Sequence, residues 1–296
     1  MSEHTIHLVD ASPYIFRGYF SIPSKMVGQS GLPVNAVYGF TQFLLRLIEQ
    51  EEVTHLGLAF DKSLTTSFRN EIYPDYKAQR ELPPPALEAQ LDWCQEVGEA
   101  LGAAIYVDLR YEADDLVGTL CRQLEADGHE LVVVTSDKDL AQLVNERVTL
   151  LDFAKDERYD AAKVEEKFGV RPEQIADYLG LAGDSVDNIP GVAGVGAKTA
   201  VALLSALGSL EAIYERLDEV PSLPIRGAKS LHKKLVDQRE QAFLSRQLAT
   251  IAIDAPATAD LDELSLDGAD PELVDPLFEE LRFGRIRDRI PRWKSS

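Results

Sequence analysis

Residues 131–139 read Leu-Val-Val-Val-Thr-Ser-Asp-Lys-Asp, an apolar and mostly β-branched run that ends at two acidic residues. The apolar part, Leu131–Thr135, predicts a strand that is buried on both faces. Four further runs have the same character: Thr5–Val9, His55–Phe60, Ala104–Val107 and Val148–Phe153. Apolar residues recur with helical spacing between them, at Ala36–Gln50, Leu87–Leu101, Ala113–Ala126 and Asp139–Val144. Strands that alternate with helices predict an α/β fold, in which helices cover both faces of a parallel sheet.

The chain changes character after residue 160, where helical patterns alone are predicted. These patterns cover Ala161–Phe168, Pro172–Leu181, Ala197–Ala206, Leu210–Leu217, Ala228–Ala249 and Pro271–Leu281. Glycine and proline separate them. We therefore expect an α/β domain at residues 1–160 and a helical part at residues 161–296 that packs against it.

The composition is that of a water-soluble enzyme or binding protein. The chain has 296 residues, 45% of them hydrophobic, and no apolar run is long enough to span a membrane. The N-terminus lacks the basic and apolar regions of a secretory signal. Cys94 and Cys121 have neither zinc-site nor disulfide spacing, so we expect buried free thiols. A cytoplasmic protein with no membrane partner fits these features.

The net charge of −20 is unevenly distributed. Ten acidic residues and no lysine or arginine lie between Asp254 and Glu280, and nine more acids belong to the motifs described below. Without these, 31 acidic residues face 30 basic ones, with basic clusters at 62–80, 226–234 and 282–294. A nucleic-acid partner is therefore compatible with the negative total charge.

Three predicted strands end at an aspartate, namely Asp10, Asp61 and Asp137, and Asp139 follows two residues later. The carboxyl ends of parallel strands lie at one edge of a sheet, where such sheets bind ligands. Two more acidic groups stand after a strand or a helix: Glu112, Asp114 and Asp115, and then Asp184 and Asp187. Taken singly, these acids could cap helices or turns.

Taken together, the acids require cations. Two carboxylates about 4 Å apart repel by about 4 kcal/mol at an effective dielectric constant of about 20. Lys138 is the one basic residue inside these motifs, so a divalent metal is the better compensation. Oxygen ligands alone favour Mg²⁺ or Mn²⁺, and paired metals of this kind hydrolyse phosphodiesters.

The order of these motifs resembles that of the bacterial 5′ nucleases. The motifs are Leu8-Val9-Asp10, Phe60-Asp61, Glu112-Ala113-Asp114-Asp115, Ser136-Asp137-Lys138-Asp139 and the run from Gly183 to Gly191. This family contains the flap endonuclease and 5′→3′ exonuclease domain of DNA polymerase I and its stand-alone relatives, and the similarity runs from about residue 5 to about residue 290. It implies a PIN-like or resolvase-like nuclease core followed by a helix–hairpin–helix.

The resemblance implies a metal site and a gateway over it. The family's metal ligands correspond to Asp10, Asp61, Glu112, Asp114, Asp115, Asp137, Asp139, Asp184 and Asp187, which would hold two or more Mg²⁺ ions, or Mn²⁺ instead. A helical gateway is expected at about residues 62–100. In it, Lys77 and Arg80 would contact the phosphate to be cut, and Tyr76 would stack near the displaced nucleotide. The alternative is a solvated basic helix.

Further DNA contacts follow from the resemblance. Residues 184–206 would form the helix–hairpin–helix, whose glycine amides and helix N-terminus bind backbone phosphate and whose loop carbonyls hold K⁺. The expected contacts are Gly191, Gly194, Gly196, Lys198 and Thr199, with Arg17, Arg69, Arg226 and Lys229 elsewhere. A P-loop is excluded because Ala197 stands where its lysine must be. A plain turn between helices stays open, and so does the role of the basic tail 282–294.

The leading hypothesis is therefore a 5′→3′ exonuclease and 5′-flap endonuclease of replication and repair. Its partners would be DNA with 5′ flaps or 5′ ends and RNA primers on DNA, and it would act as a monomer, with a DNA polymerase as a possible partner. Two alternatives stay open. One is a non-catalytic DNA-binding module, and the other is a PIN-type ribonuclease, which would not need the helix–hairpin–helix.

Overall fold

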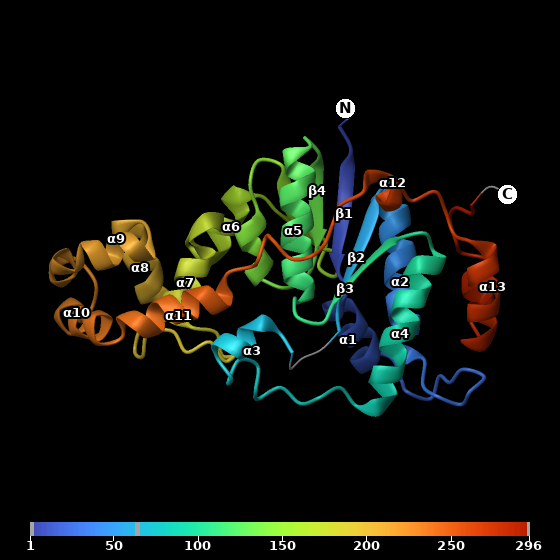
Figure 1. Ribbon diagram of the computed structural model, residues 1–296, viewed down its shortest axis with the longest axis horizontal. Helices are drawn as coiled ribbons and strands as arrows, with labels where there is room; N and C mark the ends of the chain where they lie inside the picture. The colour runs from blue at the N-terminus through green and yellow to red at the C-terminus, as the bar shows by residue number, and fades with distance from the viewer. Residues whose placement is uncertain (1–2, 63–65, 295–296) are drawn as a thin grey trace.

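The computed structural model describes residues 3–62 and 66–294 and centres on a six-stranded sheet of order β3-β2-β1-β4-β5-β6 (Figure 1). The strands are β1 (Thr5–Asp10), β2 (Leu56–Asp61), β3 (Ala104–Asp108), β4 (Glu130–Val134), β5 (Val148–Asp152) and β6 (Glu157–Tyr159). The first five pair in parallel, which confirms the predicted sheet. β6 adds an antiparallel edge and was not predicted, because it has three residues and only Tyr159 is buried.

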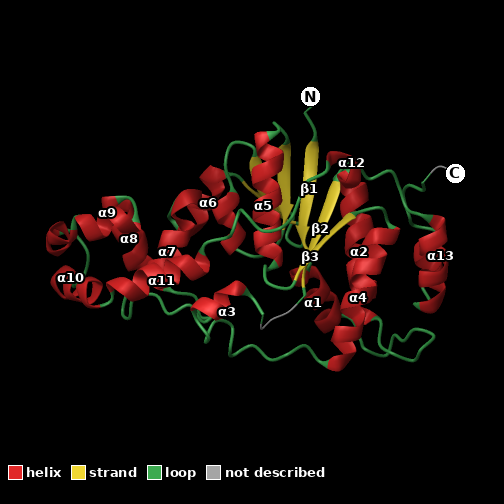
Figure 2. Ribbon diagram, viewed as in Figure 1, coloured by secondary structure: helices red, strands yellow, loops and turns green. Residues whose placement is uncertain are grey.

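Helices cover both faces of this sheet, as predicted (Figure 2). Ile6 and Leu8 of β1 point into the core shared with α5 (Ala113–Ala126) and α6 (Ala161–Phe168). Val9 points into the opposite core, which is closed by α1 (Ser12–Ser21), α2 (Asn35–Gln50) and α4 (Pro85–Ala100). Successive side chains of a strand point to opposite faces of the sheet, so β1 contributes residues to both cores.

Helix α1 was not predicted, and it is essential to the site because it leaves the sheet directly after Asp10. It packs against α2 at Gly18, where an added Cβ would lie 2.8 Å from the Ala36 carbonyl oxygen. Such an approach of two backbones is open only to glycine. The apolar pattern of α1 is short and mixed with aromatic residues, so helical periodicity does not reveal it.

The helical part extends to one side of the sheet and follows the predicted order (Figure 1). It contains α7 (Ile175–Ala182), α8 (Ala197–Leu207), α9 (Leu210–Glu215), α10 (Ala228–Asp237) and α11 (Arg239–Ala249), with 3-10 turns at Pro172–Gln174 and Leu217–Ser222. The predicted single helix Ala228–Ala249 is interrupted at Gln238, where φ is −124° and ψ is 27°. The Gln238 side chain accepts a hydrogen bond from the Ala193 amide, so this break helps to hold the loop before α8.

The end of the chain returns to the α/β part. Its helices are α12 (Leu261–Leu264), α13 (Pro271–Glu280) and α14 (Gly284–Arg287). Val274, Phe278 and Ile286 belong to the same core as α2 and α4. The proposed division at residue 160 therefore needs correction, because the residues from about 260 onward pack on the helical layer of α2 and α4 rather than extending the helical part (Figure 1).

The expected gateway at about residues 62–100 is helical at residues 68–72 and 85–100 but not in between. It contains α3 (Phe68–Ile72), a series of turns and an extended stretch that ends where α4 begins at Pro85; residues 63–65 lie outside the described part. Proline at 74, 83, 84 and 85 opposes a continuous helix through this stretch. None of the helices in the described ranges is long and apolar enough to cross a membrane.

Candidate active site

The strand-end acids meet at one edge of the sheet, as predicted. Asp10 is 3% exposed and accepts hydrogen bonds from the Thr135 hydroxyl at 2.9 Å and from the Ser12 amide at 3.3 Å. Asp61 accepts from the Ser12 hydroxyl at 2.6 Å and from the Ala113 amide at 2.9 Å. Ser12 thus connects the ends of β1 and β2. The sequence reasoning missed Ser12 and Thr135, although each stands two residues from a predicted ligand.

The first turn of α5 adds two acids to this edge. Glu112 accepts hydrogen bonds from the Lys77 ammonium at 2.9 Å and from the Tyr76 hydroxyl at 3.1 Å. Burial alone would raise the pKa of Glu112, but Lys77 and Arg69 hold it below its usual value. Asp114 has the opposite balance, because burial and then the nearby Asp10 raise its pKa well above the ordinary value.

A second acidic group lies in an adjacent crevice of about 260 Å³, which is lined by Pro13, Ser136, Asp137, Lys138, Asp139, Asp184, Val186 and Asp187. Burial, followed by repulsion from Asp137, raises the pKa of Asp139 to about 8. One Asp139 oxygen, Oδ1, is buried and has no hydrogen-bond partner. Asp184 pairs with the Lys138 ammonium at 2.5 Å.

Basic residues of the gateway lie against these carboxylates. Lys77 reaches Asp187 at 3.7 Å in addition to Glu112, and Arg80 contacts the other Asp187 oxygen at 2.5 Å. The Lys77 amide also donates to the Asp187 carbonyl at 3.0 Å, with Lys77 in the left-handed region at φ 54°. Non-glycine residues in this conformation are costly and are concentrated at functional sites. The gateway and the loop after α7 therefore form one wall of the site.

The site suits hard divalent cations. Across residues 3–62 and 66–294, no three acidic, histidine or cysteine side chains converge closely enough to hold a metal as they stand. Lys77, Arg80 and Lys138 lie among the acids instead. Burial, and then Asp61 and Asp137, nevertheless raise the pKa of Asp10 to about 8. Buried carboxylates with raised pKa values and a free oxygen, Asp139 Oδ1, are what added positive charge would stabilise.

Asp115 and Arg69 differ from their predicted roles. Asp115 is fully buried, and its two oxygens accept from the Arg69 guanidinium at 2.7 Å each. The amides of Glu112 and Ala252 donate to the same two oxygens at 3.1 and 2.8 Å. Arg69 is 3% exposed and also donates to the Leu248 and Thr250 carbonyls. Asp115 thus has no open side for a metal, and Arg69 has none for DNA.

Two further residues are also more enclosed than predicted. The Tyr76 ring is 3% exposed, so it is packed in the core rather than presented to a nucleotide. The Gly191 amide donates to the Ser245 hydroxyl at 3.0 Å, which leaves it unavailable to a phosphate. Both corrections have one cause: segments distant in sequence cover these groups.

The other predicted DNA contacts are accessible. Helices α7 and α8 flank the loop 183–196, in the segment for which the helix–hairpin–helix was predicted. Gly194, Gly196 and Lys198 are exposed on it, and Thr199 is half-buried in the first turn of α8. Arg226 and Lys229 are exposed at the start of α10, and Arg17 is exposed on α1. Cys94 and Cys121 are buried free thiols, as predicted.

A parallel α/β sheet that gathers acids at its carboxyl edge, beside basic side chains, is an arrangement that suits a metal-dependent enzyme acting on phosphate groups. The chain belongs to the 5′-3′ exonuclease family, because residues 5–169 match its N-terminal resolvase-like domain and residues 170–272 match its C-terminal SAM fold. This membership confirms the predicted 5′ nuclease and resolvase-like core.

Relatives at the sequence level are bacterial polymerases. DNA polymerase I of Pseudomonas aeruginosa is 43% identical over 293 residues, which cover 99% of this chain and 32% of that protein. DNA polymerase I of Bacillus subtilis is 40% identical over 287 residues, with 96% and 32% covered. The chain spans about a third of the length of these relatives.

Solved structures share the fold at low identity. T5 5′-exonuclease with bound divalent metal ions (zinc) has a TM-score of 0.68 at 20% identity, covering 95% of this chain and 99% of that one. The catalytic core of Rad2 with DNA substrate has a TM-score of 0.59 at 16% identity, covering 97% and 93%. These likenesses extend the fold assignment over nearly the whole chain.

Proposed function

We propose that the chain is a divalent-metal-dependent 5′ nuclease that cuts at the junction between a single-stranded 5′ flap and duplex DNA, and also from a 5′ end. The observation that carries this proposal is the set of buried, like-charged acids with raised pKa values, Asp10, Asp114 and Asp139, at the carboxyl edge of the sheet. A buried carboxyl group of this kind either keeps its proton or is ionised beside a cation, and a divalent metal ion at this edge would supply that positive charge.

Eight of the nine predicted acids would hold Mg²⁺, or Mn²⁺ in its place, and Asp115 would not. Asp10, Asp61, Glu112 and Asp114 form one group, and Asp137, Asp139, Asp184 and Asp187 form the other. When bound, the metal ions supply Lewis acidity for the attacking water and the leaving 3′ oxygen. Lys77 pairs with one acid of each group, Glu112 and Asp187, and Arg80 pairs with Asp187. Both side chains would exchange these partners for the phosphate.

The helical part would hold the duplex by its phosphates without reading sequence. Gly194, Gly196 and Lys198 are exposed at the start of α8, and Arg226 and Lys229 are exposed at the start of α10, where they would present amides and cations to the duplex. K⁺ would bind at the loop carbonyls, in competition with the Lys234 ammonium, which lies 3.3 Å from the Gly194 oxygen. Substrates would include RNA primers on DNA, the active form would be a monomer in the cytoplasm, and a DNA polymerase would act beside it.

The test is cleavage of a labelled 5′-flap duplex with Mg²⁺, with Mn²⁺ and with a chelator. We expect cutting with either metal and none with the chelator. Asp137→Asn should reduce cleavage by about a thousandfold or more while flap binding persists, since the asparagine still accepts the Asp139 amide hydrogen bond seen at 2.9 Å. Wild-type cutting by this variant would refute the ligand assignment.

Substrate comparison separates the remaining alternatives. Binding of the flap without any metal-dependent product would indicate a DNA-binding module. Preference for single-stranded RNA over the 5′-flap duplex would indicate a PIN-type ribonuclease.

A further inference from the structure

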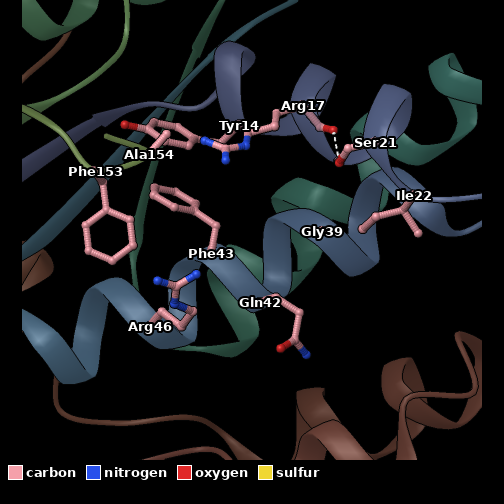
Figure 3. Close-up of a pocket in the computed structure, with 11 residues that line it drawn as sticks. Tyr14, Arg17, Ser21, Ile22, Gly39, Gln42, Phe43, Arg46, Phe153 and Ala154 are labelled. Carbon is pink, nitrogen blue, oxygen red and sulfur yellow. Dashed lines mark hydrogen bonds between the residues drawn. The ribbon is translucent and has the colours of Figure 1, made fainter. Parts of the chain in front are cut away.

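A second pocket lies beside α1, and Asp61 is not among the residues that line it (Figure 3). It has a volume of about 210 Å³ and is formed by α1, α2 and the turn after β5. Its lining includes Tyr14, Arg17, Phe43, Arg46 and Phe153. Tyr14 and Arg17 are three residues apart and share a helix face, whereas Ser12 and Phe16 line a different cavity beside Asp61. The pocket is therefore separate from the acidic crevice.

One wall of this pocket is aromatic. The Tyr14 and Phe43 rings stack with centroids 3.8 Å apart and planes 5° apart. The Phe153 ring meets Phe43 edge-on at 5.6 Å and 71°. Phe43 and Phe153 are only half-buried, so flat apolar surface stays open to a planar ligand.

Two guanidinium groups lie beside that wall. The Arg46 guanidinium is 5.7 Å from the centroid of the Phe153 ring, and Figure 3 shows Arg17 and Arg46 next to the stacked rings. Both arginines are exposed. Among the described residues, no carboxylate lies within ion-pair distance of either. In a chain with net charge −20, two unpaired arginines at one pocket indicate an anion site.

We propose that this pocket binds a nucleotide of the substrate other than the one that is cut. Its phosphate would lie between Arg17 and Arg46, and its base or sugar would contact Phe153 and Phe43. Helix α1 connects the two sites, because Pro13 lines the acidic crevice and Tyr14 lines the pocket. The nucleotide thus belongs to a strand that passes within one helical turn of the active site. This inference rests on the proposed nuclease function and deepens it.

The test is the affinity for a 5′-flap duplex, measured by fluorescence anisotropy in chelator across a range of salt concentrations. Arg17→Ala and Arg46→Ala should each weaken binding by about five- to tenfold, and each should reduce the salt dependence by about one counterion. Phe153→Leu should weaken binding by about fivefold without changing the salt dependence. Arg147→Ala is the matched control, because it removes one charge at the amino end of β5, the opposite edge of the sheet.

The same assay identifies which strand of the flap substrate supplies the nucleotide. Single phosphates are replaced by neutral methylphosphonates along each strand of the flap substrate. At one position, the replacement should weaken wild-type binding but leave binding by the Arg17→Ala/Arg46→Ala variant unchanged. The strand that contains this position is the one that occupies the pocket.

Failure of this inference can be distinguished from failure of the proposed nuclease function. If the wild type binds no flap DNA, the nuclease proposal itself fails. If the wild type binds and the double variant matches it in affinity and salt dependence, the pocket does not contact substrate and this inference is wrong.

Discussion

The buried pair Arg69–Asp115 shows how one residue contact decides the position of several segments. Arg69 belongs to α3 and Asp115 to α5, and further hydrogen bonds connect the pair to Leu248 in the last turn of α11 and to Thr250 and Ala252 after it. The pair thereby joins the gateway, the catalytic helix and the end of the helical part. Removal of one partner from such a pair leaves a buried charge without compensation.

Arg69→Met should lower the free energy of unfolding by about 3 kcal/mol, measured by chemical denaturation. The double variant Arg69→Met/Asp115→Leu should recover part of this loss, because no charge is then stranded. Arg80→Met is the control, and its partly exposed pair with Asp187 should change stability by about 1 kcal/mol or less. A loss of under about 1 kcal/mol for Arg69→Met would contradict the structural role.

His7 in β1 provides a pH-dependent test of burial. It is 4% exposed and its Nδ1 has no partner. Burial, aided by Arg158, lowers its pKa from 6.5 to about 4. The unfolded chain therefore takes up the proton first, and the stability that neutral His7 contributes is complete above pH 6.5 and is lost as the pH falls toward 4.

His7→Phe removes this titration. When the pH is lowered from 7.5 to 5, the unfolding free energy of the wild type should fall by about 2 kcal/mol more than that of the variant. Parallel stability curves over this range would show that His7 titrates normally.

At the scale of elements, the loop between α7 and α8 depends on two close backbone approaches. Gly183 has φ +73°, and an added Cβ there would lie 2.6 Å from the Ile189 oxygen. Gly191 has φ +60°, and its Cβ would overlap the Gly183 nitrogen. This crossing holds Asp184 and Asp187 toward the gateway.

Gly191→Ala should destabilise the protein by more than about 2 kcal/mol and impair cleavage. The alanine would be strained at a positive φ, and its Cβ would force the Gly183 and Gly191 backbones apart. Gly196→Ala is the matched control, since it has open space around its Cβ position and a negative φ of −102°. It should change the unfolding free energy by about 1 kcal/mol or less. Equal stability of the two variants would show that the crossing tolerates a side chain.

At the scale of the whole molecule, the site opposes folding in the absence of metal. The raised pKa values of Asp10 and Asp139, each about 8, mean that the folded state retains protons that the unfolded chain releases near pH 4. The stability from these protons is fully present below the unfolded pKa and is lost as the pH rises toward 8. Metal binding should restore it, because the ligand binds only the folded state.

Asp10→Asn should therefore raise the melting temperature in chelator at pH 8 by about 2 °C or more, and should abolish cleavage. Mg²⁺ or Mn²⁺ should raise the melting temperature of the wild type more than that of the variant. Asp156→Asn, an exposed acid in the turn before β6, is the control and should change neither property. A less stable Asp10→Asn protein would contradict the proposed repulsion.

The sequence by itself determined the parallel sheet, the acids at its carboxyl edge and the family, because strand periodicity and strand-end position are local properties of the chain. Only the tertiary structure decided that Asp115 and Arg69 neutralise each other, that Tyr76 and the Gly191 amide are enclosed, and that residues after 260 pack against α2 and α4. Each of these depends on contacts between segments far apart in sequence, such as that between Arg69 and Asp115, whose positions differ by 46. Residue type and spacing indicate that a carboxylate is present, but the packing of distant segments decides whether a metal, a guanidinium or a backbone amide compensates it.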